Sequence, residues 1–351
     1  MHYPLGIGTA TAVAALFLSA SATPVAADTY SKELIAAAKK EGEVVVYHSV
    51  NRGVLKNLCA TYEKKFGVKA TCTRKTTGGV SRMVAAESIA GKLKCDIVSA
   101  GDGGLFIAWH KQGLLQPYKS VNYDKYRKEV QDPTFASSPA RMTYYGIEYS
   151  TKQIKKGEEP KDWKDVLDPK WKGKIGVINP DTGGPARLFL SAIVKMYGWE
   201  FVEKLSKQKP LMIKSSSTAA NMLVQGEVAL TIPGSEHAVA KMRAKGQPVD
   251  FVYPKSGLLI KDSRVAICKG GKNPNAAKLW IDFETSKEGQ GIITKVGAYP
   301  PVRPDVDMPI KRPAGVFDSD KVIGVSEEHL MTKGPAERKK FMQIMKAGAG
   351  S

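Results

Sequence analysis

Three short stretches of the sequence combine hydroxyl side chains with the start of an expected helix, an arrangement typical of anion binding. In residues 177–190, VINPDTGGPARLFL, Thr182, Gly183 and Gly184 follow a β-rich run and precede an apolar helical segment. Backbone N–H groups at a helix start are unpaired and lie at the positive end of the helix dipole, which favours an anion. Arg187, one turn into that helix, can add a bidentate contact to an oxyanion.

The other two stretches precede helices elsewhere in the chain. Thr76, Thr77 and Gly78 lead into GGVSRMVAAESIAGK, and KSSSTAANML places Ser215 to Thr218 before a third helix. Taken singly, each hydroxyl is more simply explained as an N-cap that satisfies free backbone donors. If all three starts face one cleft, they favour an oxyanion site, and they add the candidates Thr76, Thr77, Gly78, Ser216, Ser217 and Thr218.

Short β runs alternate with helical periodicity through residues 43–104. This pattern predicts an α/β fold with a mostly parallel sheet and helices on both faces. Ligands bind at the carboxyl ends of the strands in such sheets. Those ends add four candidates to the site: His48, Ser49, Asp102 and Gly103.

The length of 351 residues predicts about two domains. Lys and Arg exceed Asp and Glu by 53 to 34, which gives a net charge of +19. The basic residues are spread along the chain rather than gathered in one stripe, so nucleic-acid binding is not favoured. A field of this sign raises the local concentration of small anions.

The N-terminus has the features of an export signal. A short apolar run is followed by Val25-Ala26-Ala27, the small residues that a signal peptidase requires, although no Lys or Arg precedes the run. We expect residues 1–27 to be a signal peptide, and the mature chain to be periplasmic and without a membrane span. In that oxidising compartment the four cysteines can form two disulfides, with three possible pairings. They show no spacing typical of a metal site, and none is predicted.

Four segments resemble the type II periplasmic solute-binding proteins of ABC importers: ELIAAAKKEGEVVVYHSV, WKDVLDPKWKGKI, MLVQGEVAL and VGAYPPVRPDV. The resemblance runs from about residue 34 to 309 and is strongest to the branch of ferric-ion, aminoethylphosphonate and sugar-phosphate binders. It implies a monomer with two α/β lobes that close on a solute and deliver it to an ABC permease. It places the first lobe at 28–144 and 258–351 and the second at 145–257. The two crossings are then expected at Tyr144–Lys152 and Phe251–Gly257.

The resemblance also bears on the ligand. Ferric members carry adjacent tyrosines in the loop after the GEV strand, but here that loop holds Ser235, Glu236 and His237 and no tyrosine. Tyr145 lies on a crossing that lines the cleft in the family. A small anionic organic solute, such as a phosphonate, sugar phosphate or polar carboxylate, is therefore favoured. Ferric ion stays open as an alternative, with His48, Glu236, Tyr145 and Tyr149 as N and O ligands.

A 2-1-3 strand order, as expected for this fold, would let Cys59 reach Cys72. Cys95 would meet Cys268 if the returning strand runs antiparallel beside the third strand. A secreted phosphoester hydrolase is the rival from another class, but no G-x-x-x-x-G-K-[ST], G-x-G-x-x-G or G-x-S-x-G motif occurs. The sequence thus predicts a binding protein that needs no cofactor, rather than an enzyme.

Overall fold

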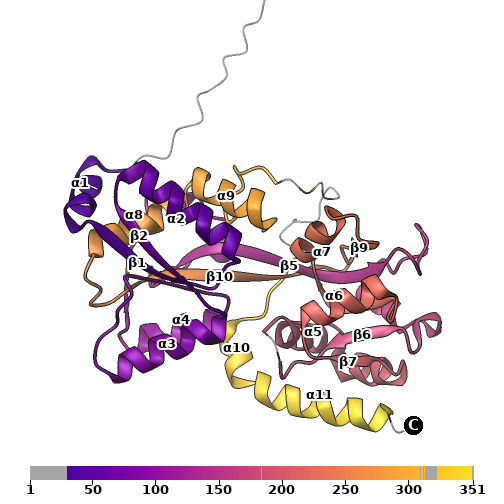
Figure 1. Cartoon of the computed structure of the whole chain (residues 1–351). Helices are drawn as coiled ribbons and strands as arrows, with labels where there is room; N and C mark the ends of the chain where they lie inside the picture. The colour runs from indigo at the N-terminus through magenta and orange to yellow at the C-terminus, as the bar shows by residue number, and fades with distance from the viewer. Residues whose placement is uncertain (1–29, 183, 309, 311, 313–321, 350–351) are drawn as a thin grey trace, which may run out of the picture.

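The computed structural model describes residues 30–182, 184–308, 310, 312 and 322–349. The predicted signal peptide lies outside these residues. The strands on the main path of the sheet are β1 (Glu43–His48), β2 (Lys69–Arg74), β3 (Ile97–Ala100), β5 (Ser138–Ser150), β6 (Ile175–Ile178), β7 (Leu211–Ile213), β8 (Leu230–Ser235) and β10 (Leu258–Cys268). They form one mixed sheet in the order β2-β1-β3-β10-β5-β8-β6-β7, which runs through both of the lobes in Figure 1.

The first lobe is built on β2, β1 and β3, which are parallel as predicted. One face of its sheet carries α1 (Lys32–Glu41), α2 (Arg52–Phe66), α8 (Pro274–Glu284) and α9 (Lys287–Gly297). The other face carries α3 (Thr77–Ile89) and α4 (Gly103–Lys111). Because each strand is followed by a helix that crosses back, the starts of α2, α3 and α4 all lie at the carboxyl edge of the sheet.

The second lobe is built on β8, β6 and β7, with β6 parallel to both neighbours. Its helices are α5 (Gly184–Lys207), α6 (Ser216–Gln225) and α7 (Glu236–Arg243). Short elements complete the two lobes: β4 (Leu115–Gln116), β9 (Val249–Val252) and the 3₁₀ turns Tyr123–Lys125, Lys128–Val130, Trp163–Leu167 and Pro169–Trp171. Gly198 breaks α5 with a φ of 69°.

Helix α2 shows how the sequence sets these elements. The Asn51 side chain accepts a hydrogen bond from the N–H of Val54 at 2.9 Å, and Gly67 ends the helix with a φ of 65°. Its buried residues include Val54, Leu58 and Tyr62, spaced four apart on one face. That face packs into the core of the first lobe beside Trp280 and Phe283.

Two long antiparallel strands, β5 and β10, connect the lobes. The first predicted crossing, Tyr144–Lys152, overlaps β5. The second was predicted at Phe251–Gly257, which ends just before the strand that crosses. The crossing strand is β10, whereas Val249–Val252 pairs with β5 inside the second lobe.

The C-terminal segment returns to the second lobe. Strand β11 (Val322–Ile323) pairs with the start of β10 and leads to α10 (Glu327–Thr332) and α11 (Gly334–Ala349). Helix α11 packs along α5, and its Phe341 and Met345 join the core of the second lobe. We therefore propose that α11 belongs with the second lobe, although the sequence placed all of 258–351 in the first.

Two disulfides connect elements of the first lobe. Cys59 is joined to Cys72 and Cys95 to Cys268, with Cα separations of 6.7 and 6.0 Å. Both pairs follow from the 2-1-3 order and from the antiparallel pairing of β10 with β3. None of the helices in the described ranges is long and apolar enough to cross a bilayer.

Candidate functional site

Arg141, on the hinge strand β5, is the most unusual polar residue of the interlobe region. Its side chain is only 7% exposed, yet its Nε and Nη1 groups have no acceptor among the described residues. Its guanidinium carbon lies 5.2 Å from the ring centre of Tyr299. Burial lowers the pKa of Arg141 because it disfavours the charged form. An unpaired buried charge costs several kcal/mol, so this position favours an anionic partner.

Gly101, which directly follows β3, lies close to this guanidinium and to Thr77, the first residue of α3. The Gly101 N–H donates to Thr77 Oγ1 at 3.2 Å, which joins the start of α3 to the end of β3. A Cβ on Gly101 would lie 3.3 Å from Thr77 Oγ1, 3.5 Å from Ser263 Oγ and 3.8 Å from Arg141 Nη2. These distances place two hydroxyls and one guanidinium nitrogen around the same small volume. Arg141 and Ser263 are also direct partners in the pairing of β5 with β10.

The second lobe contributes His237 to this cluster. Its Nδ1 lies 2.7 Å from Ser235 Oγ, and its ring centre lies 4.3 Å from that of Tyr299. Burial, followed by the charges of Lys241 and Arg141, lowers the pKa of His237 to about 3. His237 is therefore neutral near pH 7, and the positive charge of the site resides on Arg141 and Lys241. We call Arg141, Thr77, Gly101, Ser263, Ser235, His237 and Tyr299 the hinge cluster.

Two of the predicted site residues are occupied by partners within the protein. His48 is 1% exposed, its Nε2 lies 3.0 Å from Glu284 Oε1, and its Nδ1 accepts the N–H of Val50 at 2.9 Å. Glu236 is 2% exposed; Arg312 donates to both of its carboxylate oxygens at 2.5 Å, and Tyr253 donates to one of them. Neither side chain presents a free group to a ligand, so we do not retain them.

Several predicted site residues cap helices or form local hydrogen bonds. Thr76 caps α3 through the N–H of Gly79, and Asp102 caps α4 through that of Gly104, both at 3.1 Å. Thr182 Oγ1 donates to the carbonyl of Asn179 at 2.8 Å, and Arg187 Nε donates to that of Pro180 at 3.3 Å.

The remaining predicted residues at strand ends and helix starts make no side-chain contact that bears on a ligand, where the structure describes them. Ser49 Oγ is buried and has no partner within the described ranges, and Gly78 is exposed in the first turn of α3. Ser215 is the N-cap of α6, so Ser216 and Thr218 belong to its exposed first turn rather than preceding it. Gly183 and the Ser217 side chain lie outside the described residues. The start of α5 does face the hinge, because a Cβ on Gly184 would lie 3.9 Å from Lys261 Nζ.

Adjacent tyrosines do not converge on one point in this structure. Tyr144 and Tyr145 are consecutive residues of β5, so their side chains point to opposite faces of the sheet. Tyr144 packs with Tyr126 and Val302, whereas Tyr145 belongs to the core of the second lobe. Burial raises the pKa of both phenols, to about 12 for Tyr144, which disfavours phenolate ligands. No cluster of three or more His, Cys, Asp or Glu suited to a metal occurs among the described residues.

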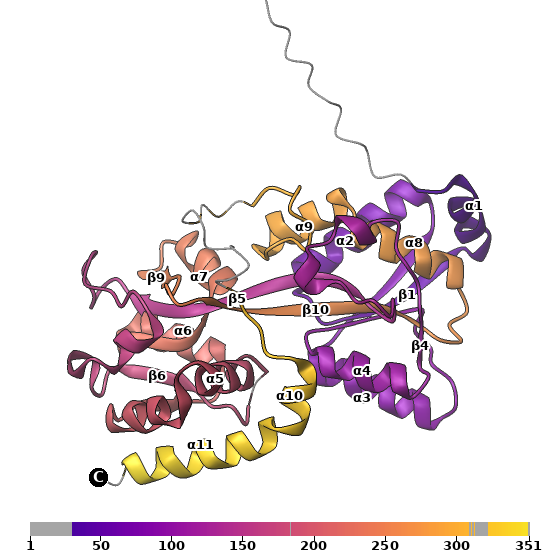
Figure 2. The ribbon, with the colours of Figure 1, turned by 180° about the vertical axis from the view of Figure 1, so that it is seen from behind.

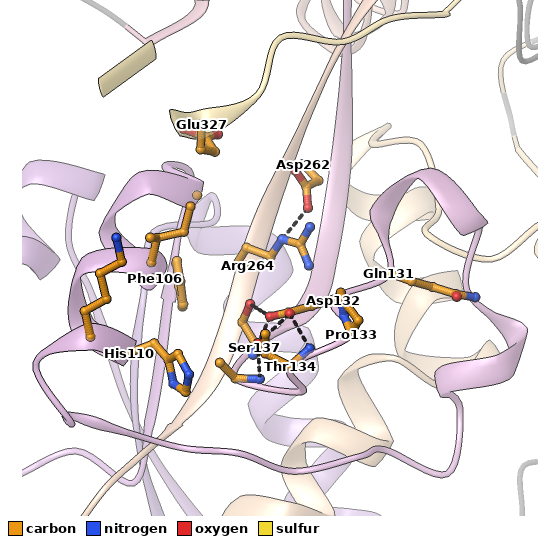
Figure 3. Close-up of a pocket in the computed structure, with 14 residues that line it drawn as sticks. Phe106, His110, Gln131, Asp132, Pro133, Thr134, Ser137, Asp262, Arg264 and Glu327 are labelled. Atoms are coloured by element: carbon orange, nitrogen blue, oxygen red, sulfur yellow. Dashed lines mark hydrogen bonds and ion pairs between the residues drawn. The ribbon is translucent and has the colours of Figure 1, made fainter. Parts of the chain in front are cut away.

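A cavity of about 380 Å³ lies beside the hinge, between α4, residues 131–137 and β10. Figure 3 shows Phe106 and His110 on one side and Arg264, Asp132 and Ser137 on the other. Of the predicted site residues described, only Gly103 lines it. The Asp132 carboxylate is saturated by the backbone and hydroxyl groups of Thr134 and Ser137. None of the residues of the hinge cluster lines this cavity.

Two α/β lobes joined by paired hinge strands, with a polar cluster drawn from both, define a two-lobed periplasmic binding protein of type II. The chain belongs to the bacterial extracellular solute-binding proteins, because that family matches residues 93–320. It is a periplasmic solute-binding protein of the ABC-transporter type, as the sequence resemblance predicted.

Three relatives illustrate the range of the family. A protein of Haemophilus influenzae with no assigned function is 28% identical over 74% of this chain and 78% of its own length. The major ferric iron-binding protein of Neisseria meningitidis serogroup A is 30% identical, over 46% of this chain and half of its own. The periplasmic binding protein AfuA of Actinobacillus pleuropneumoniae, with fructose-6-phosphate bound, is 26% identical with a TM-score of 0.69, covering 86% of this chain and 97% of its own.

Sequence reasoning missed Arg141 and Tyr299. The available signal was the position of Arg141 in the run SPARMTYYGIEYS, where one cation interrupts a segment that is buried throughout. A buried cation on such a strand is costly, and so it merits attention as a functional group.

Proposed function

We propose that this protein captures a small anionic organic solute between its lobes in the periplasm, as the binding component of an ABC uptake system. Arg141 provides the principal anion contact. The observation that carries the proposal is its buried guanidinium, whose Nε and Nη1 groups lack acceptors among the described residues. An oxyanion would satisfy both groups in the bidentate geometry that guanidinium favours.

The surroundings of Arg141 support a phosphate, phosphonate or carboxylate group. The hydroxyls of Thr77 and Ser263 lie near the same point as Arg141 Nη2, so an anion there would meet hydrogen-bond donors as well as the charge. Hydrogen bonds to a charged group contribute roughly 1.5–3 kcal/mol each. Residues of both lobes take part, so binding of the anion would favour closure about β5 and β10. The AfuA relative, whose structure holds a sugar phosphate, is consistent with this class of ligand.

Ferric ion is the second candidate, because the Neisseria relative is a ferric-binding protein. The described residues argue against it here. Glu236 is held by Arg312, His48 by Glu284, and the adjacent tyrosines point apart. A cation would also meet the positive charges of Arg141 and Lys241. We therefore rank iron below an organic anion.

A thermal-shift screen of metal-free protein tests the proposal. The ligands are 2-aminoethylphosphonate, fructose 6-phosphate, citrate and ferric citrate, with spermidine as a cationic control. We expect at least one organic anion to raise the melting temperature by several degrees, in line with the linkage of binding to stability. Stabilisation by ferric citrate but not by citrate, together with a visible tyrosinate-to-iron band, would move the assignment to iron.

We also propose that the protein is not an enzyme. A sensitive phosphatase assay with a generic phosphomonoester should give no turnover above that of the Arg141→Gln variant. Turnover by the parent protein that this substitution abolishes would instead indicate the hydrolase.

A further inference from the structure

A carboxylate from the C-terminal segment occupies the start of helix α4. Glu327 Oε2 accepts the N–H of Gly104 at 3.2 Å, and Glu327 Oε1 lies 3.3 Å from Lys261 Nζ on the hinge strand. The Lys261 side chain is 9% exposed and that of Glu327 is 23% exposed, so the pair is shielded from solvent. The positive end of the helix and the lysine charge both stabilise the carboxylate at this position.

Glycine at position 103 makes this contact possible. A Cβ on Gly103 would lie 2.8 Å from Glu327 Oε1 and 3.0 Å from its Cδ and Cγ. Any side chain there would therefore displace Glu327. The GDGG sequence, whose Asp102 and Gly103 we expected in the ligand site because they follow the end of a strand, instead receives a carboxylate from the protein itself.

The segment that carries Glu327 is anchored on the opposite lobe. Helix α11 follows α10 after one residue and packs along α5. Within it, Glu337 accepts from Ser191 Oγ of α5, and Arg338 Nε lies 3.5 Å from Asp181 in the loop before α5. Figures 1 and 2 both show α10 between α4 of the first lobe and α5 of the second.

We infer that Glu327 is an interlobe clasp: through it the C-terminal segment, fixed to the second lobe, holds the start of α4 in the first. Opening of the cleft must either break the contacts of Glu327 with Gly104 and Lys261 or bend α10 away from α11. The clasp thus biases the unliganded protein toward the lobe arrangement of this structure. This inference concerns the free protein and does not depend on which solute binds.

The test is a distance measurement between the lobes in the full-length, unliganded protein. Spin labels on cysteines introduced at two exposed lysines, Lys92 in the first lobe and Lys195 in the second, report the interlobe distance by pulsed dipolar spectroscopy. The first variant is Glu327→Ala. Glu328→Ala is the matched control, because it removes the same charge from the same turn of α10 while Glu328 is exposed.

We expect Glu327→Ala to move the distance distribution toward longer values, with the open population at least several-fold larger, and Glu328→Ala to match the parent. Gly103→Ala should act in the same direction, because its methyl displaces the carboxylate without removing it. Combined with Glu327→Ala it should add nothing further, since both changes remove one contact. Coincident distributions for Glu327→Ala and the parent, equal shifts for the two glutamate variants, or additive shifts for the Gly103 pair would each overturn the clasp.

Discussion

Two buried arginines of this protein have opposite environments. Arg303 is 1% exposed, and its guanidinium donates to both oxygens of Asp305, to Asn122 Oδ1 and to the carbonyl of Thr285. Arg141 is 7% exposed, and two of its donor groups have no acceptor among the described residues. Arg303 fixes the segment after α9 to the first lobe, whereas Arg141 faces the region between the lobes.

The difference separates a structural charge from a functional one. Burying a guanidinium is costly, and the protein offsets that cost at Arg303 with a carboxylate and two further acceptors. At Arg141 the Nε and Nη1 groups have no acceptor among the described residues, and an external anion would supply one. Removal of Arg303 should therefore affect folding, and removal of Arg141 should affect binding.

The largest expected effect is the loss of stability in Arg303→Ala. Asp305 would lose its partner, and the buried Asn122 and Thr285 carbonyl would lose a donor, so we expect a decrease of about 3 kcal/mol in the free energy of unfolding. Chemical denaturation followed by circular dichroism measures it. The affinity of the folded fraction for its solute should not change, and a stability loss below about 1 kcal/mol would remove the contrast with Arg141.

A pH-dependent stability is expected from His237, beside Arg141. Its pKa falls from 6.5 to about 3 on folding, so the unfolded chain takes up the proton first as the pH falls. The stabilisation from neutral His237 is complete above about pH 7 and is lost as the pH drops through 6.5 toward 3. Between about pH 7.5 and 5 the loss is about 2 kcal/mol. Denaturation of the His237→Gln variant should show a flatter profile, and identical profiles would place His237 in a solvated environment.

Gly101→Ala tests how closely the anion approaches β3. The added methyl would lie between Thr77, Ser263 and Arg141. We expect about tenfold weaker binding, equivalent to about 1.4 kcal/mol, with stability unchanged. Gly291→Ala is the control, because a Cβ there meets nothing within 4 Å. Calorimetry that finds equal affinity for both variants would exclude ligand from this volume.

The smallest effect on stability is expected for Arg141→Met. This change removes a buried charge without leaving an unpaired carboxylate, so the free energy of unfolding should stay within about 1 kcal/mol of the parent or rise. Thermal unfolding without ligand measures it. A loss comparable to that of Arg303→Ala would show that Arg141 is structural.

The sequence was sufficient for the features that depend on local patterns. Helix α2 begins after Asn51 and ends before Gly67, and both residue types are common helix caps. The alternation of strands and helices led to the 2-1-3 strand order, in which Cys59 pairs with Cys72. The returning strand was also expected, but its crossing was placed at Phe251–Gly257, just before β10 begins at Leu258.

The site was harder to predict, because its chemistry depends on partners distant in the sequence. His48 is removed from the candidates by Glu284 and Glu236 by Arg312, which lie 236 and 76 residues away. Conversely, Arg141 becomes a candidate only when the fold places it beside Tyr299 and Gly101 and leaves its Nε and Nη1 groups without acceptors among the described residues. Residue types and helix starts indicate an anion site, but long-range packing determines which cation remains free.

Calorimetry of three proteins tests the central claim most directly: the parent, Arg141→Gln, and Arg243→Gln, a control whose side chain is 59% exposed in a surface ion pair with Asp250. Each is titrated with the organic anion that most stabilises the parent. We predict that Arg141→Gln weakens binding at least 30-fold, about 2 kcal/mol, because it removes a charged bidentate contact, and that Arg243→Gln binds like the parent. Equal affinity in all three proteins would contradict Arg141 as the anion-binding residue.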